Sequence, residues 1–88
     1  MDPTMLMTTA SALSDPTRLL LLYLLGSGPK SVGQLVGPAR VTQPSVSYHV
    51  SRLRRAGLVF IQRLGRRTLV RRNERRWQMI TTAFNTAE

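Results

Sequence analysis

Cysteine is absent from this 88-residue sequence, which excludes disulfide bonds, thiolate catalysis and cysteine-based metal sites. Long hydrophobic runs are absent too, because the stretch from Leu19 to Leu25 is far too short to span a bilayer. The N-terminus carries Asp2 and no basic segment, unlike a secretory signal peptide. We therefore expect a cytoplasmic protein with no membrane partner.

The residue combinations that most enzymes need are missing as well. The sequence has no paired carboxylates, no cysteine–histidine pair and no glycine-rich loop that could hold a phosphate. Ser47 and His49 are close in sequence, but no acidic residue is near enough in the chain to orient the histidine. The expectation is a protein that is not an enzyme and that carries no cofactor.

Negative charge is scarce. Four acidic residues face thirteen Lys and Arg, which gives a formal net charge of +9. A polyanion is therefore the default partner. Lys30 is the only lysine, and arginine pairs with phosphate and guanine through two parallel hydrogen bonds better than lysine does. The length fits one compact domain over residues 1–88 with a modest core.

Two Asp-Pro pairs predict the first two helices, since Asp caps a helix and proline is tolerated in its first turn. The first helix follows Asp2, with Met5, Leu6, Ala10 and Leu13 as its apolar side. The second Asp-Pro pair, Asp15-Pro16, marks the start of the second helix.

The second helix follows Asp15 and stops at Gly26. Its apolar residues run all round, which predicts the central buried helix. Arg18 lies in its first turn, where the helix dipole disfavours a cation. Either Asp15 or a DNA phosphate is expected to compensate this charge.

Two further helices and a hairpin follow. Ser31 caps a third helix that is expected to end early, at Gly37-Pro38. Thr42 caps a fourth, and Gly57 ends it in a Schellman pattern that folds Leu58 back on Leu53.

After Gly57 the spacing of the apolar residues changes from that of a helix to that of β-strands. Residues 58–61 and 68–70 flank the basic tip 64–67, which predicts a β-hairpin. Asn73 then caps a last helix. The fold class is therefore mainly α with a small β-hairpin, in the order ααααββα of a winged helix-turn-helix, with the fourth helix as reader and the hairpin as wing.

The fourth helix has two opposite faces. Val46, Val50 and Leu53 form one apolar stripe. The outward face carries small hydrogen-bonding groups, arginine and no acid, and such side chains can read base edges in a major groove. Its polar residues are Gln43, Ser45, Ser47, Tyr48, His49 and Arg52.

Two of these residues have alternative roles. His49 could be a metal ligand, a pH switch, a DNA contact or a half-buried residue packed against the wing, and we favour the DNA contact because it neighbours Tyr48. Tyr48 could contact a thymine methyl or a phosphate, or could be an exposed aromatic that shields the neighbouring helix. Contact is favoured for both.

The arginines from residue 66 to residue 76 could be a solvated charge run. Such runs usually mix signs, and this one contains only Glu74. A wing that lies along phosphates explains Arg66 and Arg67 better. Trp77, Ile80 and Phe84 form a stripe on the last helix. In so short a chain, we expect this stripe to pack against a second subunit rather than its own core.

Three motifs in register resemble the ArsR/SmtB-type family of bacterial transcriptional repressors. Residues 13–18 read L-S-D-P-T-R, similar to the family's L-x-D-P-T-R. Residues 42–50 read T-Q-P-S-V-S-Y-H-V, similar to the recognition-helix motif S-Q-P-T-V-S-x-H-L. Residues 53–59 resemble L-R-x-A-G-L-V, and Gly65-Arg66 stands where the wing's G-R belongs.

The resemblance implies a symmetric homodimer, paired through the first and last helices, that binds a palindromic operator in double-stranded DNA. Candidate DNA contacts are Thr42, Gln43, Ser45, Ser47, Tyr48, His49, Arg52, Arg66 and Arg67, and candidate dimer contacts are Leu6, Trp77, Ile80 and Phe84.

The sequence departs from the family pattern in three respects. One is Gly37-Pro38, which interrupts what is usually an unbroken third helix. The metal sensors of this family use a cysteine pair or Asp, His and Glu ligands on the last helix, where this chain offers only Glu74 and Glu88. We therefore expect no metal site and no metal sensing. Arg40 occupies a turn position that is usually glycine, and a positive φ there would cost about 1 kcal/mol. The alternative is a remodelled turn in which Arg40 offers another phosphate contact.

The alternatives to a DNA-binding repressor are a winged-helix module that binds an acidic protein partner, a basic peripheral membrane binder, or a family member that responds to a non-metal ligand or partner. The membrane alternative is disfavoured, since the stripe opposite the arginines of the fourth helix is small enough to be core.

Overall fold

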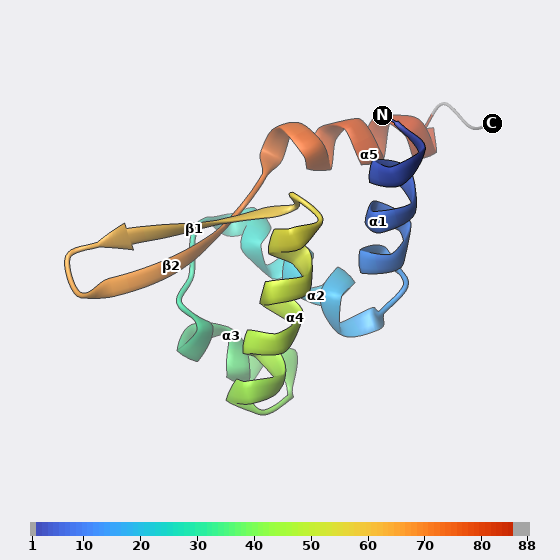
Figure 1. Ribbon diagram of the computed structural model, residues 1–88. Coiled ribbons are helices and arrows are strands. Elements are labelled where there is room, and N and C mark those ends of the chain that lie inside the picture. The colour runs from blue at the N-terminus through green and yellow to red at the C-terminus, as the bar shows by residue number, and fades with distance from the viewer. Residues whose placement is uncertain (1, 86–88) are drawn as a thin grey trace.

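A computed structural model describes the backbone of residues 2–85 and the side chains of residues 2–83. The chain order is α1 (Pro3–Leu13), α2 (Pro16–Leu24), the 3-10 turn η1 (Leu25–Ser27), α3 (Val32–Ala39), α4 (Gln43–Arg55), β1 (Val59–Leu64), β2 (Arg67–Arg72) and α5 (Glu74–Asn85). This order confirms the winged helix-turn-helix expected from the sequence (Figure 1). Within these residues, no helix is long and apolar enough to cross a membrane.

Each α-helix begins at the cap that the sequence predicts. The Asp2 carboxylate accepts a hydrogen bond from the Met5 amide at 2.9 Å. Ser31 and Gln34 form a reciprocal capping box at the start of α3. The remaining caps are Asp15 for α2, Thr42 for α4 and Asn73 for α5.

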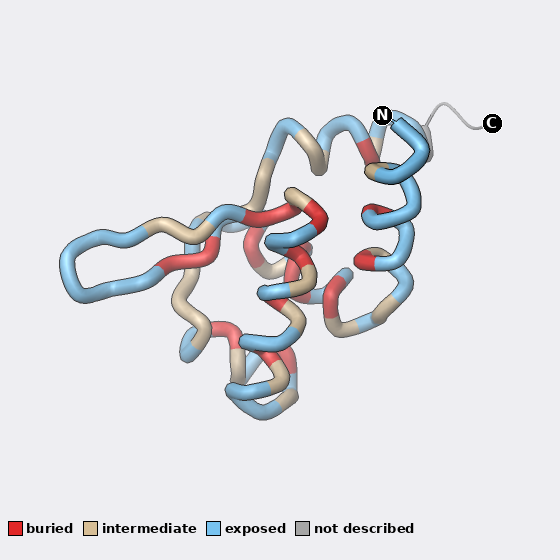
Figure 2. The backbone as a smooth tube through the Cα atoms, in the orientation of Figure 1, coloured by how far each residue is buried: buried red, intermediate tan, exposed pale blue. Residues whose placement is uncertain are grey.

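The core lies where α2, α3 and α4 meet the base of the hairpin (Figure 2). Its largest fully buried side chains are Leu21, Leu22, Leu25, Leu35, Leu53, Leu58, Val46, Val59 and Val70. The expectation that α2 is buried all round is wrong, because Leu19, Leu20 and Tyr23 are exposed. One layer of helices covers only one side of this nine-residue segment.

The prediction of which residues form the apolar side of α1 is also wrong in part. Thr9 and Ala12 are its buried residues, whereas Leu6 and Ala10 are exposed. Small side chains let α1 approach the rest of the molecule closely, and its larger residues are left facing outward.

The third helix does not end at Gly37-Pro38 as expected but continues through Pro38 to Ala39. Pro38 lies in the last turn, so the helix loses a single backbone hydrogen bond there. Arg40 follows as the C-cap with φ 58°, and its amide donates to the carbonyl of Val36 at 3.0 Å. Of the two alternatives open from the sequence, Arg40 therefore keeps the positive φ.

The hairpin pairs β1 and β2 in antiparallel register from Val59 with Arg72 to Leu64 with Arg67, and it projects away from the helices (Figure 1). The end of α4 has the predicted Schellman pattern. Leu58 donates its amide proton to the carbonyl of Leu53 at 3.0 Å, and Gly57 has φ 74°. This turn sets the angle at which the hairpin leaves α4.

Candidate nucleic-acid interface

The outward face of α4 is polar and carries no acidic residue. Gln43, Ser47 and Tyr48 are exposed, with Tyr48 at 55%. The opposite face, with Val46, Val50 and Leu53, is buried as expected. Because the apolar stripe fixes the helix in the core, the polar face is held rigidly toward solvent.

Three other predicted DNA contacts are partly buried or already take part in a hydrogen bond within the chain. Thr42 is exposed, but its hydroxyl oxygen accepts the Ser45 amide at 3.3 Å as the cap of α4. Ser45 itself is half-buried. Arg52 is half-buried and donates a long 3.5 Å hydrogen bond to the Tyr48 hydroxyl. This contact supports Tyr48 from the following turn of the helix.

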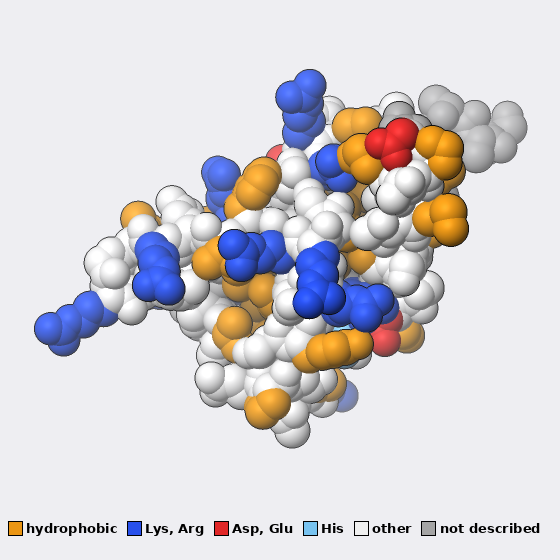
Figure 3. All heavy atoms as spheres, viewed as in Figure 1, with side chains coloured by type: hydrophobic (Ala, Val, Ile, Leu, Met, Phe, Trp, Pro, Cys, Tyr) orange, Lys and Arg blue, Asp and Glu red, His pale blue; other side chains and the backbone are white. Residues whose placement is uncertain are grey.

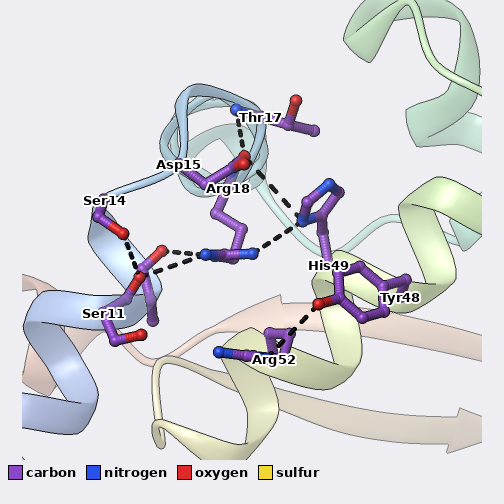
Figure 4. Close-up of polar contacts among 9 residues, drawn as sticks. Ser11, Ser14, Asp15, Thr17, Arg18, Tyr48, His49 and Arg52 are labelled. Atoms are coloured by element: carbon purple, nitrogen blue, oxygen red, sulfur yellow. Dashed lines mark hydrogen bonds and ion pairs between the residues drawn. The ribbon is translucent and has the colours of Figure 1, made fainter.

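His49 does not point outward, and that expectation is wrong. Its side chain is only 13% exposed and turns toward the start of α2, not toward the wing. The Nη1 group of Arg18 lies 3.0 Å from its Nδ1 atom (Figure 4). The sequence could not show this contact, because the two residues are 31 positions apart.

Arg18 is compensated by backbone carbonyls and by the charge of Asp15, which is one of the two alternatives expected from the sequence. It is 7% exposed, and its Nε and Nη2 groups donate to the carbonyl oxygens of Ala12 and Ser11 at 2.7 and 3.2 Å. These acceptors lie at the C-terminal end of α1, where the helix dipole favours a cation. A buried Arg18 is thus unavailable to a DNA phosphate.

Asp15 serves as the cap of α2 beside this pair. Desolvation raises the pKa of the Asp15 carboxyl, but hydrogen bonds from the Arg18 and Thr17 amides, the charge of His49 in its protonated form and the charge of Arg18 outweigh it. The net result is a pKa below the ordinary value for aspartate. The carboxylate lies 4.0 Å from His49 Nδ1.

The tip of the hairpin presents arginine to solvent. Arg66 and Arg67 are both exposed next to Gly65, whose φ of 61° forms the turn. Figure 3 shows basic side chains in blue from the hairpin tip across to the face of α4. The predicted reader and wing therefore share one positively charged side of the molecule.

Two other arginines of the charge run have structural roles that the sequence did not reveal. Arg72 pairs with Glu74 through two hydrogen bonds of 2.8 and 2.9 Å, donates to the Leu22 carbonyl at 3.0 Å and lies 4.6 Å from the Trp77 ring centroid. The hydrogen bond from Arg72 lowers the pKa of Glu74. Arg76 donates to the Ala56 carbonyl at 3.2 Å. Both residues tie the start of α5 to the rest of the fold.

Sequence reasoning left Ser51 and Arg55 out of the candidate contacts, although both are exposed on α4. Helical spacing could have found them, because Ser51 is one turn after Ser47 and Arg55 is two turns after Tyr48. They extend the polar face of α4 toward its C-terminal end.

The stripe predicted on α5 packs partly on its own chain, contrary to expectation. Ile80 is 8% exposed within the core cluster, and Trp77 packs against that cluster beside Arg72. Leu6 is 58% exposed, and the side chain of Phe84 lies outside the described residues. In the part of the chain with described side chains, no group of three or more His, Asp and Glu residues could hold a metal.

Comparison with known proteins gives a consistent match. Residues 15–59 match the family model for bacterial regulatory proteins of the arsR family. The HTH-type transcriptional repressor SmtB of Mycobacterium tuberculosis is 38% identical over 60 residues, which are 68% of this chain and 44% of that protein. The transcriptional repressor SdpR of Bacillus subtilis is 35% identical over 54 residues, 61% of this chain and 60% of that protein. The match therefore spans less than two thirds of either relative.

Solved structures agree with these matches over most of the chain. The transcriptional repressor BigR of Xylella fastidiosa superimposes with a TM-score of 0.75 at 30% identity. The superposition covers 92% of this chain and 83% of BigR. The likeness includes the helices on both sides of the matched family segment.

Proposed function

The chain belongs to the arsR family of bacterial regulatory proteins, as its motifs predicted, and we propose that it is a repressor that binds duplex DNA. In this proposal α4 enters the major groove and the hairpin lies along the flanking phosphates. The similarity to SmtB, SdpR and BigR, which are transcriptional repressors, supports the proposal. Repression follows when the bound protein occludes the polymerase.

The observation that carries the proposal is the acid-free polar face of α4 beside an arginine-tipped hairpin. Gln43 and Ser47 offer the hydrogen-bonding groups that read base edges. Arg66 and Arg67 offer charges that position the protein on phosphates without reading sequence. A solvated surface helix would more often carry mixed Glu and Lys residues there.

The proposed DNA contacts differ from the set expected from the sequence at three positions. His49 is left out, because its ring is turned into the molecule. Ser51 and Arg55 are added, because they are exposed on the same face of α4. The full proposed set is Thr42, Gln43, Ser45, Ser47, Tyr48, Ser51, Arg52, Arg55, Arg66 and Arg67.

We also propose that the protein acts as a homodimer on a palindromic operator and senses no metal. Leu6 and Met7 of α1 and Met79 of α5 are exposed at 58%, 72% and 46%. Figure 3 shows apolar side chains in orange at the end of the molecule formed by α1 and α5. Pairing two copies there buries this surface and spaces the two α4 helices about 34 Å apart, one turn of DNA.

A titration with three partners tests the proposed function. The partners are a duplex selected from a random pool, an unrelated duplex of equal length and vesicles of anionic lipid. We expect the selected duplex to bind at least about a thousandfold more tightly than the unrelated duplex. Equal binding to both duplexes and to vesicles would indicate only a basic surface, and no binding to any of them would favour a protein partner.

A further inference from the structure

The side chains of Arg18 and His49 form a contact in which the histidine can take part only as the hydrogen-bond acceptor. A guanidinium has five N–H donors and no acceptor, and it stays charged in proteins. Arg18 Nη1 lies 3.0 Å from His49 Nδ1, so the nitrogen must offer its lone pair to accept this hydrogen bond. The contact therefore requires a neutral imidazole with its proton on Nε2.

The Arg18–His49 contact links α4 to the end of α1, to which Arg18 is itself hydrogen-bonded. The other two nitrogens of Arg18 donate to the carbonyl oxygens of Ser11 and Ala12 at the end of α1 (Figure 4). His49 is thus the point at which α4 meets a buried charge that bridges α1 and α2. Its ring also stands edge-on to Tyr48, with centroids 5.2 Å apart and planes at 70°. A movement of His49 would carry Tyr48 with it.

We propose that His49 is a positioning residue that holds the reading face of α4 in place through Arg18, and that protonation of His49 releases this hold and weakens operator binding. The proposal rests on the DNA-binding function proposed above. A proton on Nδ1 places a hydrogen between two cations and removes the acceptor. Asp15, 4.0 Å from the same nitrogen, then becomes the better partner, and the ring turns from Arg18 toward the cap of α2.

The charged surroundings of His49 are few. From α2 it faces Arg18 and Asp15, and from α1 it faces only the carbonyl end, because the last two turns of that helix carry no titratable side chain. Residues 32–39 of α3 have no titratable side chain either. On α4 itself, Tyr48 adjoins it and Arg52 follows one turn later. The exchange between Arg18 and Asp15 is therefore the principal electrostatic change on protonation.

The test compares the wild type with two variants at about pH 8 and about pH 5.5, which bracket the range in which histidine changes charge. His49→Asn places its amide oxygen near the position of Nδ1 and cannot gain a proton. His49→Leu fills similar space without an acceptor. Each protein is titrated with a duplex selected by the wild type at pH 8, at fixed ionic strength, and thermal unfolding confirms that each is folded.

We expect operator affinity of the wild type to fall about tenfold more than that of His49→Asn between the two pH values, equivalent to about 1.4 kcal/mol. His49→Asn should bind like the wild type at pH 8, and His49→Leu should bind weakly at both pH values. Equal pH dependence of wild type and His49→Asn would overturn the proposal. Full affinity of His49→Leu would overturn it as well.

A second measurement needs no DNA. His49 is the single histidine, so long-range ¹H–¹⁵N spectra report its tautomer without ambiguity. We expect the proton on Nε2 at pH 8, and amide shifts of α4 that follow the protonation of His49. A proton on Nδ1 at pH 8 would contradict the contact. If neither the wild type nor either variant binds any duplex, the proposed function fails, and the spectra alone decide whether His49 positions α4.

Discussion

The guanidinium of Arg76 donates a hydrogen bond to the carbonyl oxygen of Ala56 at 3.2 Å, which joins the first turn of α5 to the C-cap of α4. Asn73 adds a second bond to the adjacent carbonyl of Gly57 at 2.8 Å. The helix proposed to read DNA is therefore fixed at its end by the start of α5, and near its middle by the Arg18–His49 contact.

Gly57→Ala should destabilise the protein by more than about 1 kcal/mol, because alanine is strained at the φ of 74° that the turn requires. An added Cβ would also meet Arg76 Nη1 at 3.0 Å. The free energy of unfolding in urea measures the effect. Gly33→Ala is the matched control, since Gly33 lies in α3 with only the Ser31 Oγ atom at 3.9 Å from an added Cβ, and the change should raise stability by up to about 1 kcal/mol. Similar losses in both variants would contradict this account.

The order of elements was predictable from the sequence because its signals are local. Asp2, Asp15, Ser31, Thr42 and Asn73 cap helices through hydrogen bonds to amides two or three residues away. The outward orientation of Tyr48 followed from helical spacing in the same way. Such features depend on neighbours in the chain, which a sequence displays directly.

The errors concern contacts between distant segments. His49 was assigned to the outward face because its partner, Arg18, lies 31 residues earlier. The all-round apolar character of α2 hid the fact that Leu20 and Tyr23 have no covering layer within the chain. The sequence assigned no individual role to Arg72 within its run of arginines, although this residue reaches the Leu22 carbonyl 50 residues away. Helical periodicity indicates a face but does not identify its partner.

Arg40→Gly should stabilise the protein by up to about 1 kcal/mol, because the left-handed conformation of Arg40 costs a residue with a Cβ but not glycine. Arg40→Ala keeps the strain and removes the charge, so it should bring no gain in unfolding free energy. If the exposed Arg40 side chain contacts a phosphate, both variants should weaken DNA binding equally. A gain in Arg40→Ala as large as in Arg40→Gly would show that strain is not the cause.

Acid should weaken the fold through Asp15. Its pKa in the folded protein lies below the ordinary value of 3.8, so its contribution is complete above that value and is lost as pH falls through the folded pKa. The unfolding free energy of the wild type should thus decline below about pH 4. Asp15→Asn can still cap α2 but has no such carboxylate, and the difference between the two proteins should shrink with acid. A constant difference across this range would exclude Asp15 as the source.

Gln43→Ala should reduce discrimination between duplexes, whereas Arg66→Ala should weaken binding to all of them. Gln43 can pair with adenine N6 and N7, which is worth roughly 1–3 kcal/mol of discrimination. Arg66 is exposed at the hairpin tip, and its loss should lower the slope of log affinity against log salt by about one unit. Titrations of selected and unrelated duplexes at several salt concentrations measure both effects. Equal losses on both duplexes for both variants would mean that α4 does not read sequence.

The dimer is best tested at exposed residues rather than at the stripe on α5. Trp77 and Ile80 pack on their own chain, so their loss would destabilise each protomer as well as any interface. Leu6→Glu and Met79→Glu instead place a charge at side chains that are 58% and 46% exposed. They should leave thermal unfolding of the protomer nearly unchanged.

Sedimentation at micromolar concentration should show the wild type at twice the 9.9 kDa chain mass and Leu6→Glu as a monomer. Burying a large apolar side chain contributes about 1.5–3 kcal/mol, and Leu6→Glu would lose this contribution and also bury a charge in the interface. The variant should therefore lower the free energy of dimerisation by more than this amount. Operator binding should weaken with dissociation, since a monomer has one reading helix and half the phosphate contacts. Tyr23→Glu, on the exposed side of α2 and 74% exposed, is the control and should remain a dimer. If Tyr23→Glu dissociates and Leu6→Glu does not, α2 rather than α1 forms the interface.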